Sequence, residues 1–143
     1  MKILAFALCL LAAPAAAAEF RVVGESGAVL YDAPSTQATP LFVVTRFYPL
    51  EVVVELEAWA KVRDATGMIS WVEKSALTDK RMVLVTAASA EARLRPDDAA
   101  PVAFVAAQNV ALELVEPAGA GWLHVRAADG ADGFLRASAC WGG

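Results

Sequence analysis

Few side chains in this sequence could carry covalent chemistry. A nucleophilic site needs a cysteine or serine beside a base, and the chain has one histidine, His124, and two cysteines, Cys9 and Cys140. Cys9 lies in an apolar N-terminal stretch, so only His124 and Cys140 could form a thiol–imidazole dyad in the rest of the chain. Whether these two side chains can meet depends on the elements that carry them.

Metal-binding chemistry has even less support. One histidine, one cysteine and dispersed carboxylates give no ligand spacing suited to zinc. The segment 128–133, "ADGADG", superficially resembles a calcium loop, but it lacks the alternating oxygen ligands and the closing glutamate. We therefore interpret it as a turn, and we expect neither a metal nor a cofactor.

The first eighteen residues have the pattern of a secretory signal peptide. Lys2 precedes an apolar run over 3–13, and Ala16 and Ala18 form a small-residue cleavage pattern before Glu19. The apolar run is too short to be expected to span a bilayer. The sequence therefore predicts a signal peptide over 1–18 and an exported mature chain.

A lipid anchor is not expected, because Cys9 follows Leu8 and not the small residue that lipid attachment requires. The mature protein would then carry no membrane anchor. The short signal favours a periplasmic location, with secretion beyond the periplasm as the alternative.

The charge of the chain limits the classes of partner that we expect, and its cysteine content limits what can stabilise the fold. The full chain has a formal net charge of −4, and removing Lys2 with the signal makes it one unit more negative. The longest basic run is Lys80-Arg81, so a nucleic-acid partner is not expected. With Cys140 as the only remaining thiol, no internal disulfide can form, and stability must come from packing.

The rest of the chain contains the same pattern twice. At a spacing of 62 residues, Pro34 matches Pro96 and Phe42 matches Phe104; at a spacing of 63, "WAKVRDATG" from Trp59 matches "WLHVRAADG" from Trp122. A one-residue insertion within "EPAGAGW", relative to "ELEAW", explains the change of spacing. Such self-similarity marks a repeated structural unit.

Each copy has the alternation of β-strands. "LEVVVELE" predicts a strand with one apolar face and one acidic face, and "WAKVR" predicts a strand with Ala60 and Val62 inward. The expected apolar face of the first strand comprises Leu50, Val52, Val54 and Leu56. The second strand's outward residues are expected to be Trp59, Lys61 and Arg63.

Helical periodicity is missing from both copies, apart from a single turn expected at "EKSAL" and at "RASAC". Several short strands in about sixty residues favour a small barrel. The predicted fold is therefore all-β, with one barrel over 19–80 and a second over 81–143. A domain this small is marginally stable alone, and "TDKRM" leaves almost no linker, so the barrels are expected to pack together.

The first copy resembles the bacterial SH3-like family. Trp59-x-x-Val62-Arg63 and Trp71-Val72 are similar to the family's Trp-x-x-Val-Arg and Gly-Trp-Val patterns, and "ARLRPD" from Ala92 resembles its Val-Arg-x-x-Pro opening. The sequence departs at Ser70, where the family usually has Gly, and at Phe134, where it usually has Trp. The resemblance implies tandem SH3-like domains that are generally non-catalytic and often bind cell-wall peptides or glycan.

The repeat also argues against a catalytic dyad. His124 matches Lys61 on the outward face of its strand, whereas Cys140 matches the apolar Leu77. The two side chains should point apart, so we do not expect an enzyme. Cys140 is instead expected to behave as a small apolar core residue.

A recurring strand face is the best candidate for a binding surface. An exposed aromatic ring flanked by cations could stack on a sugar or peptide plane while pairing with a carboxylate. The alternative is structural: the rings close the barrel ends or fill the seam between barrels, and the arginines pair with local acids. The candidate residues are Tyr31, Trp59, Lys61, Arg63, Trp71, Trp122, His124 and Arg126.

Two functions of different classes follow from this pattern. The first is a non-catalytic binding or scaffolding module of the cell envelope that recognises peptidoglycan or its peptides. The second is a structural or protein-interaction module that binds an envelope protein or self-associates and takes no small ligand.

Overall fold

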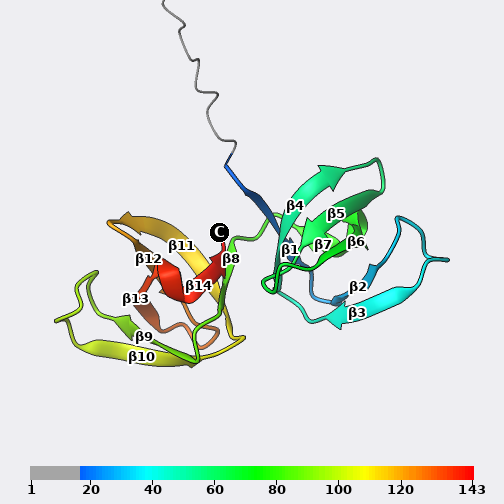
Figure 1. The fold of residues 1–143 in the computed structure, drawn as a ribbon. Helices are drawn as coiled ribbons and strands as arrows, with labels where there is room; N and C mark the ends of the chain where they lie inside the picture. Colours follow the sequence, from blue (N-terminus) through cyan, green and yellow to red (C-terminus); the bar gives the residue numbers. More distant parts are fainter. Residues whose placement is uncertain (1–16) are drawn as a thin grey trace, which may run out of the picture.

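The structure is a computed structural model that describes residues 17–143. It contains two antiparallel sheets that lie side by side, with the connection between them running through the middle (Figure 1). The expected signal peptide lies outside the described range except for its last two residues. Within the described residues, no helix is long and apolar enough to cross a membrane.

Each sheet has seven strands. The first sheet, here the first domain, contains β1 (Glu19–Val23), β2 (Ala28–Tyr31), β3 (Pro40–Val44), β4 (Pro49–Glu55), β5 (Trp59–Arg63), β6 (Ile69–Glu73) and β7 (Leu77–Thr78). The second sheet, the second domain, contains β8 (Met82–Val85), β9 (Ser89–Arg93), β10 (Val102–Ala107), β11 (Ala111–Gly119), β12 (Trp122–Arg126), β13 (Asp132–Arg136) and β14 (Cys140–Gly142). The all-β expectation is confirmed.

The two sheets have the same strand order. It runs β3-β2-β6-β5-β4-β1-β7 in the first and β10-β9-β13-β12-β11-β8-β14 in the second, so each strand of one domain has a counterpart in the other. Single 3-10 turns, η1 (Lys74–Ala76) and η2 (Ala137–Ala139), stand where the two helical turns were expected. The sequence repeat is therefore a repeat of topology.

Equivalent turns repeat the same hydrogen bonds. The Gly67 N–H donates to the Asp64 carbonyl at 2.9 Å, and the Gly130 N–H donates to the Ala127 carbonyl at 2.9 Å. Both glycines have φ of 91°, which a residue with a Cβ rarely adopts. The segment "ADGADG" thus forms the turn that the first copy predicts.

Each domain has its own apolar core. Ala60, Val62 and Val72 have no exposed surface in the first, and Val125 and Leu135 are 0% and 1% exposed in the second. These side chains come from alternate positions of β5, β6, β12 and β13, because successive strand residues point to opposite faces. The expected inward direction of Ala60 and Val62 is confirmed.

The predicted alternation of β4 is wrong beyond its middle. Leu50 is buried and Val52 packs against the core, but Val54 and Leu56 are 42% and 45% exposed. The pairing of β4 with β5 shifts register between Val52 and Val54, so Val53 forms a bulge that turns the following side chains outward. Such a bulge depends on the pairing with the partner strand and leaves no mark in the apolar pattern of the sequence.

Trp141 connects the two domains. Its indole N–H donates to the Pro49 carbonyl at 3.3 Å, and its ring meets the Phe20 ring edge-on with centroids 5.2 Å apart. Pro49 begins β4 and Phe20 lies in β1, whereas Trp141 lies in β14, which faces the first domain in Figure 1. The domains therefore pack together as expected, through a residue whose counterpart in the first copy is Thr78.

Replacing Trp141 by alanine should uncouple the two domains. Loss of the ring contact and the hydrogen bond should lower the free energy of unfolding by about 2 kcal/mol. Differential scanning calorimetry should then resolve two transitions where the unaltered chain gives one. Trp141→Phe retains an aromatic ring but not the N–H, so its free energy of unfolding should lie between those of the unaltered chain and Trp141→Ala. An unchanged single transition in Trp141→Ala would contradict this role.

Candidate binding surface

Three aromatic rings and one ammonium group gather on the outer side of the first domain. Tyr31 and Trp59 meet edge-on with centroids 5.6 Å apart, and the Lys61 Nζ lies 5.9 Å from the centre of the Trp71 ring. Register pairs Trp71 with both Tyr31 and Lys61, so three neighbouring strands place these side chains together. We call Tyr31, Trp59, Lys61 and Trp71 the aromatic–cation face.

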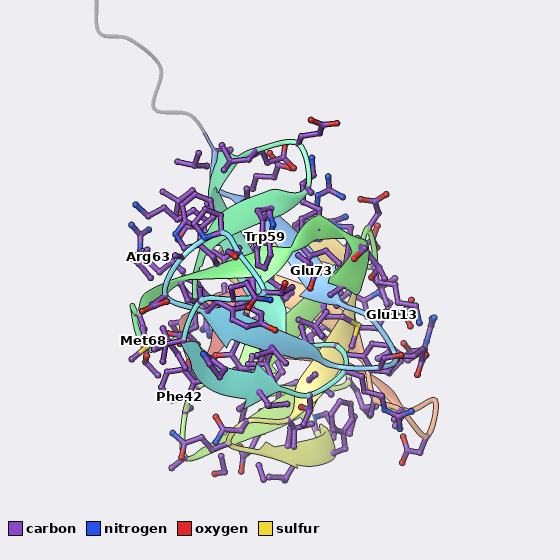
Figure 2. All side chains as sticks on the ribbon, turned by 90° about the vertical axis from the view of Figure 1, so that its right-hand side faces the viewer. Phe42, Trp59, Arg63, Met68, Glu73 and Glu113 are labelled. Atoms are coloured by element: carbon purple, nitrogen blue, oxygen red, sulfur yellow. The ribbon has the colours of Figure 1, made fainter. Side chains whose placement is uncertain are left out.

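This surface is built by strand alternation above the core. Trp59 and Lys61 are partly exposed, and they alternate with the fully buried Ala60 and Val62. Figure 2 looks on to the first domain and shows Trp59 near the middle of the view. Tyr31, at the end of β2, is likewise half-buried. The rings are thus supported from below while remaining accessible from above.

Arg63 does not join this group. Its guanidinium pairs with the Glu51 carboxylate at 2.7 Å, across the β4–β5 pairing, and only 19% of the Glu51 side chain is exposed. Figure 2 shows Arg63 displaced to one side of Trp59. Of the three predicted outward residues of β5, Arg63 therefore satisfies a local acid, which is the structural alternative.

The second domain does not repeat the open surface. Trp122 was expected to be exposed, but only 6% of its surface is accessible, because the Arg136 guanidinium lies 4.2 Å from the ring centre. The residue opposite Trp59 in the first domain is Glu73, whereas the residue opposite Trp122 is Arg136. At this position, a cation that covers the ring replaces an anion that does not. The expected exposure of Trp122 is therefore wrong, and its burial agrees with the structural alternative.

An acid holds Arg136 in place over the indole. Arg136 donates a hydrogen bond to the Asp98 carboxylate, and this bond keeps the pKa of Asp98 below its ordinary value. Asp98 belongs to the loop between β9 and β10. The second tryptophan is therefore covered by a side chain that is itself fixed from another loop.

His124 and Arg126 are also engaged within the second domain. The His124 ring stacks on Phe134 with centroids 4.8 Å apart, and its Nε2 lies 3.3 Å from an Asp132 carboxylate oxygen. Arg126 Nε lies 3.2 Å from the same Asp132 oxygen. Phe134 and Arg93 occupy the positions of Trp71 and Tyr31 in the first copy. Of the four residues of the aromatic–cation face, the second domain therefore keeps only the tryptophan, and its histidine and arginine contact acids of the same domain.

Sequence reasoning missed an exposed apolar patch on the first domain. Phe42, Met68 and Ile69 are 47%, 40% and 39% exposed. In the second domain, Phe104 instead packs against the core, in the space above Gly133. A Cβ on Gly133 would lie 3.1 Å from the Phe104 ring and 2.7 Å from the Ala92 Cβ.

The signal for this patch was present in the sequence. The first copy has Ser70 where the second has Gly133, and Leu30 where the second has Ala92. Ser70 and Leu30 are 2% and 1% exposed, so these larger side chains fill the corresponding space. Phe42 consequently lies on the surface.

Cys140 lies against the core of the second domain, as its match with Leu77 predicts. Desolvation raises the pKa of its thiol to about 11. The thiol form therefore dominates at neutral pH, whereas a nucleophile requires the thiolate. Among residues 17–143, no group of three histidine, cysteine, aspartate or glutamate side chains is arranged to hold a metal ion.

The raised pKa predicts slow alkylation of Cys140. In a chain with Cys9→Ser, where Cys140 is the sole thiol, iodoacetamide at pH 8 should react on the order of 100-fold more slowly with the folded protein than with the urea-unfolded protein. The folded rate should keep rising as the pH approaches 11, because the thiolate becomes populated there. Similar rates for the two states at pH 8 would contradict the buried thiol.

Comparison with known proteins shows the family to which the chain belongs. The family model described as "Bacterial SH3 domain" matches the chain twice, over residues 24–79 and 86–142. No curated protein matches the chain significantly. Similar solved structures include NlpC1 from Trichomonas vaginalis, at 13% identity and a TM-score of 0.41, and NlpC2 from the same organism, at 13% identity and a TM-score of 0.40.

These solved structures are longer proteins. The alignments cover 90% and 87% of this chain but only 47% and 48% of NlpC1 and NlpC2, so the chain spans about half their length. The family match, in contrast, covers most of the chain, and each of its two segments lies within one of the two sheets described above. The expectation of two tandem SH3-like domains is confirmed, and the chain belongs to the bacterial SH3 domain family.

Proposed function

We propose that the protein is an exported, non-catalytic binding module of the cell envelope, and that its first domain recognises peptidoglycan peptides. Bacterial SH3 domains are binding modules for proteins and cell walls and are generally non-catalytic. The pattern of residues 1–18 supports export, with the periplasm as the favoured compartment. Only the first domain has an open aromatic–cation face, which suits a module that binds one ligand per chain.

The aromatic–cation face carries this proposal. Stacking on Trp59 or Trp71 would hold a peptide plane or a sugar ring, and the Lys61 ammonium would pair with a carboxylate. Peptidoglycan peptides offer both groups, a flat amide and a free carboxylate. Because the rings already contact Tyr31 and Lys61, little side-chain freedom would be lost on binding, which favours affinity.

The two domains differ in a way that supports one site per chain. Trp122 is covered by Arg136, and His124 lies against Phe134 and Asp132. A ligand would have to displace these intramolecular contacts before it reached the second tryptophan. The first domain therefore recognises the ligand, and the second has a supporting role.

A titration of tryptophan fluorescence with soluble peptidoglycan fragments tests the assignment. Lys61→Gln should weaken binding roughly tenfold, because a charge-assisted hydrogen bond to the ligand is lost. The matched control is His124→Gln, at the equivalent position of the second domain, which should bind as the unaltered chain does. Absence of a saturable change, or equal weakening by both substitutions, would overturn the proposal.

A second candidate function, association with an envelope protein or with another copy, is favoured by β3. Every residue of this edge strand is exposed or partly exposed, and Val43 is 77% exposed. An edge strand with free backbone groups and apolar side chains is a template for pairing with another strand.

Sedimentation velocity distinguishes this second function. Self-association through β3 should give a dimer that Val43→Lys returns to the monomer, since an edge lysine opposes strand addition. Val53→Lys, on the exposed bulge of β4, is the control and should leave the dimer intact. A monomer at all concentrations would leave self-association without support.

A further inference from the structure

A cleft between the two domains is separate from the aromatic–cation face. It has a volume of about 530 Å³, and residues of both domains and of the connection between them line it. This volume lies within the range of small-molecule sites, which often form at domain interfaces. Its walls include Phe47 from the first domain, Lys80 and Arg81 from the connection, and Leu114 and Arg126 from the second domain.

The connection supplies two cations that have no acidic partner in the described part of the chain. Lys80 and Arg81 are exposed, and neither takes part in an ion pair within residues 17–143. Lys80 Nζ lies 4.5 Å from the centre of the Phe47 ring. In a chain with a net charge of −4, this pair forms a local positive site.

The acidic side chains near the cleft already pair with cations other than Lys80 and Arg81. Glu113 lines the cleft, and Arg126 NH1 lies 3.8 Å from its carboxylate. Asp79, which precedes Lys80, pairs with Arg21 at 2.5 Å. Lys80 and Arg81 therefore remain available to a negatively charged ligand.

Apolar surface lies beside these cations. The half-buried Phe47 lines the cleft, as do Met82 and Leu114, of which 8% and 4% remain exposed. A ligand that is wholly ionic would leave this surface in contact with water, whereas an apolar group would cover it. The lining thus favours a ligand with a charged end and an apolar end.

The backbone at Phe47 is a third observation. Phe47 has φ of 68°, a left-handed conformation that is costly for a bulky side chain. Its counterpart Asn109 has φ of 67°, and asparagine adopts this region more readily. The Phe47 N–H donates to the Val23 carbonyl at 2.8 Å, and Asn109 repeats this bond to Val85, so the turn itself does not require phenylalanine.

We propose that the interdomain cleft binds a carboxylate carried next to an apolar group. Lys80 and Arg81 take the carboxylate, and Phe47, Met82 and Leu114 take the apolar part. A free aliphatic acid and the C-terminal leucine of a peptide both have this chemistry. The site needs both domains, so it exists only in the tandem chain, and it does not depend on what the aromatic–cation face binds.

Amide NMR spectra of the full two-domain chain, titrated with octanoate and separately with acetyl-Ala-Ala-Leu, test the proposal. Saturable shifts are expected at Ala111, Ala127, Ala128 and Gly130, which line the cleft. Octanamide and the C-terminally amidated peptide, which lack the charge, should bind at least tenfold more weakly. Shifts with octanoate alone identify a free acid as the source of the carboxylate, and shifts with the peptide alone identify a chain terminus.

Charge variants locate the site. Lys80→Gln and Arg81→Gln should each weaken binding roughly tenfold, and Lys80→Arg and Arg81→Lys should restore most of it. Arg95→Gln removes an exposed cation that lines no part of the cleft and should change nothing. The unperturbed spectrum of each variant reports whether it is folded. Absence of shifts with both probes, or equal affinity in Lys80→Gln and Arg95→Gln, would overturn the proposal.

Discussion

The contact of Trp141 with Phe20 and Pro49 fixes how the two sheets lie against each other. Each sheet encloses a small core, and no disulfide can join the two domains, because Cys140 is the sole cysteine of the described residues. One indole therefore supplies both an aromatic contact and a hydrogen bond at the seam. The interdomain cleft has walls from both sides, so its shape depends on how the two domains are held together.

The two copies share a backbone and differ in what their surfaces do. The first domain has Glu73, Tyr31 and Trp71 where the second has Arg136, Arg93 and Phe134. These differences leave the outer face of the first domain open, whereas the side chains of the second face contact one another. Similarly, Ser70 and Leu30 expel Phe42, while Gly133 and Ala92 admit Phe104. The hydrogen-bonded framework is thus the same in both copies, whereas a few cross-strand neighbours differ and give the two domains different surfaces.

Patterns confined to one strand or one turn were predictable from the sequence. Alternation placed Ala60 and Val62 inward, the repeat identified the Gly130 turn, and the match with Leu77 placed Cys140 on the core. Features that depend on a neighbouring strand were not predictable in this way. The burial of Trp122 requires Arg136 opposite it and Asp98 from another loop, and the exposure of Val54 requires a bulge against β5.

Contacts across the domain boundary were the least predictable. Nothing in the repeat distinguishes Trp141, because its counterpart is Thr78. Lys80 likewise gains a partner ring only because the fold brings Phe47 near it. Such contacts depend on how the two domains are placed relative to each other, and the periodicity of a single strand carries no information about that placement.

The pairing of β1 with β7, and of β8 with β14, orders the assembly of the molecule in time. Each sheet joins its first strand to its last, so neither can close before its final strand has been made. As the chain emerges from its N-terminus, the first domain can complete itself once Thr78 is available, while the second still waits for Gly142. Trp141 belongs to that last strand, so the strand that closes the second sheet also carries the residue that contacts the first domain.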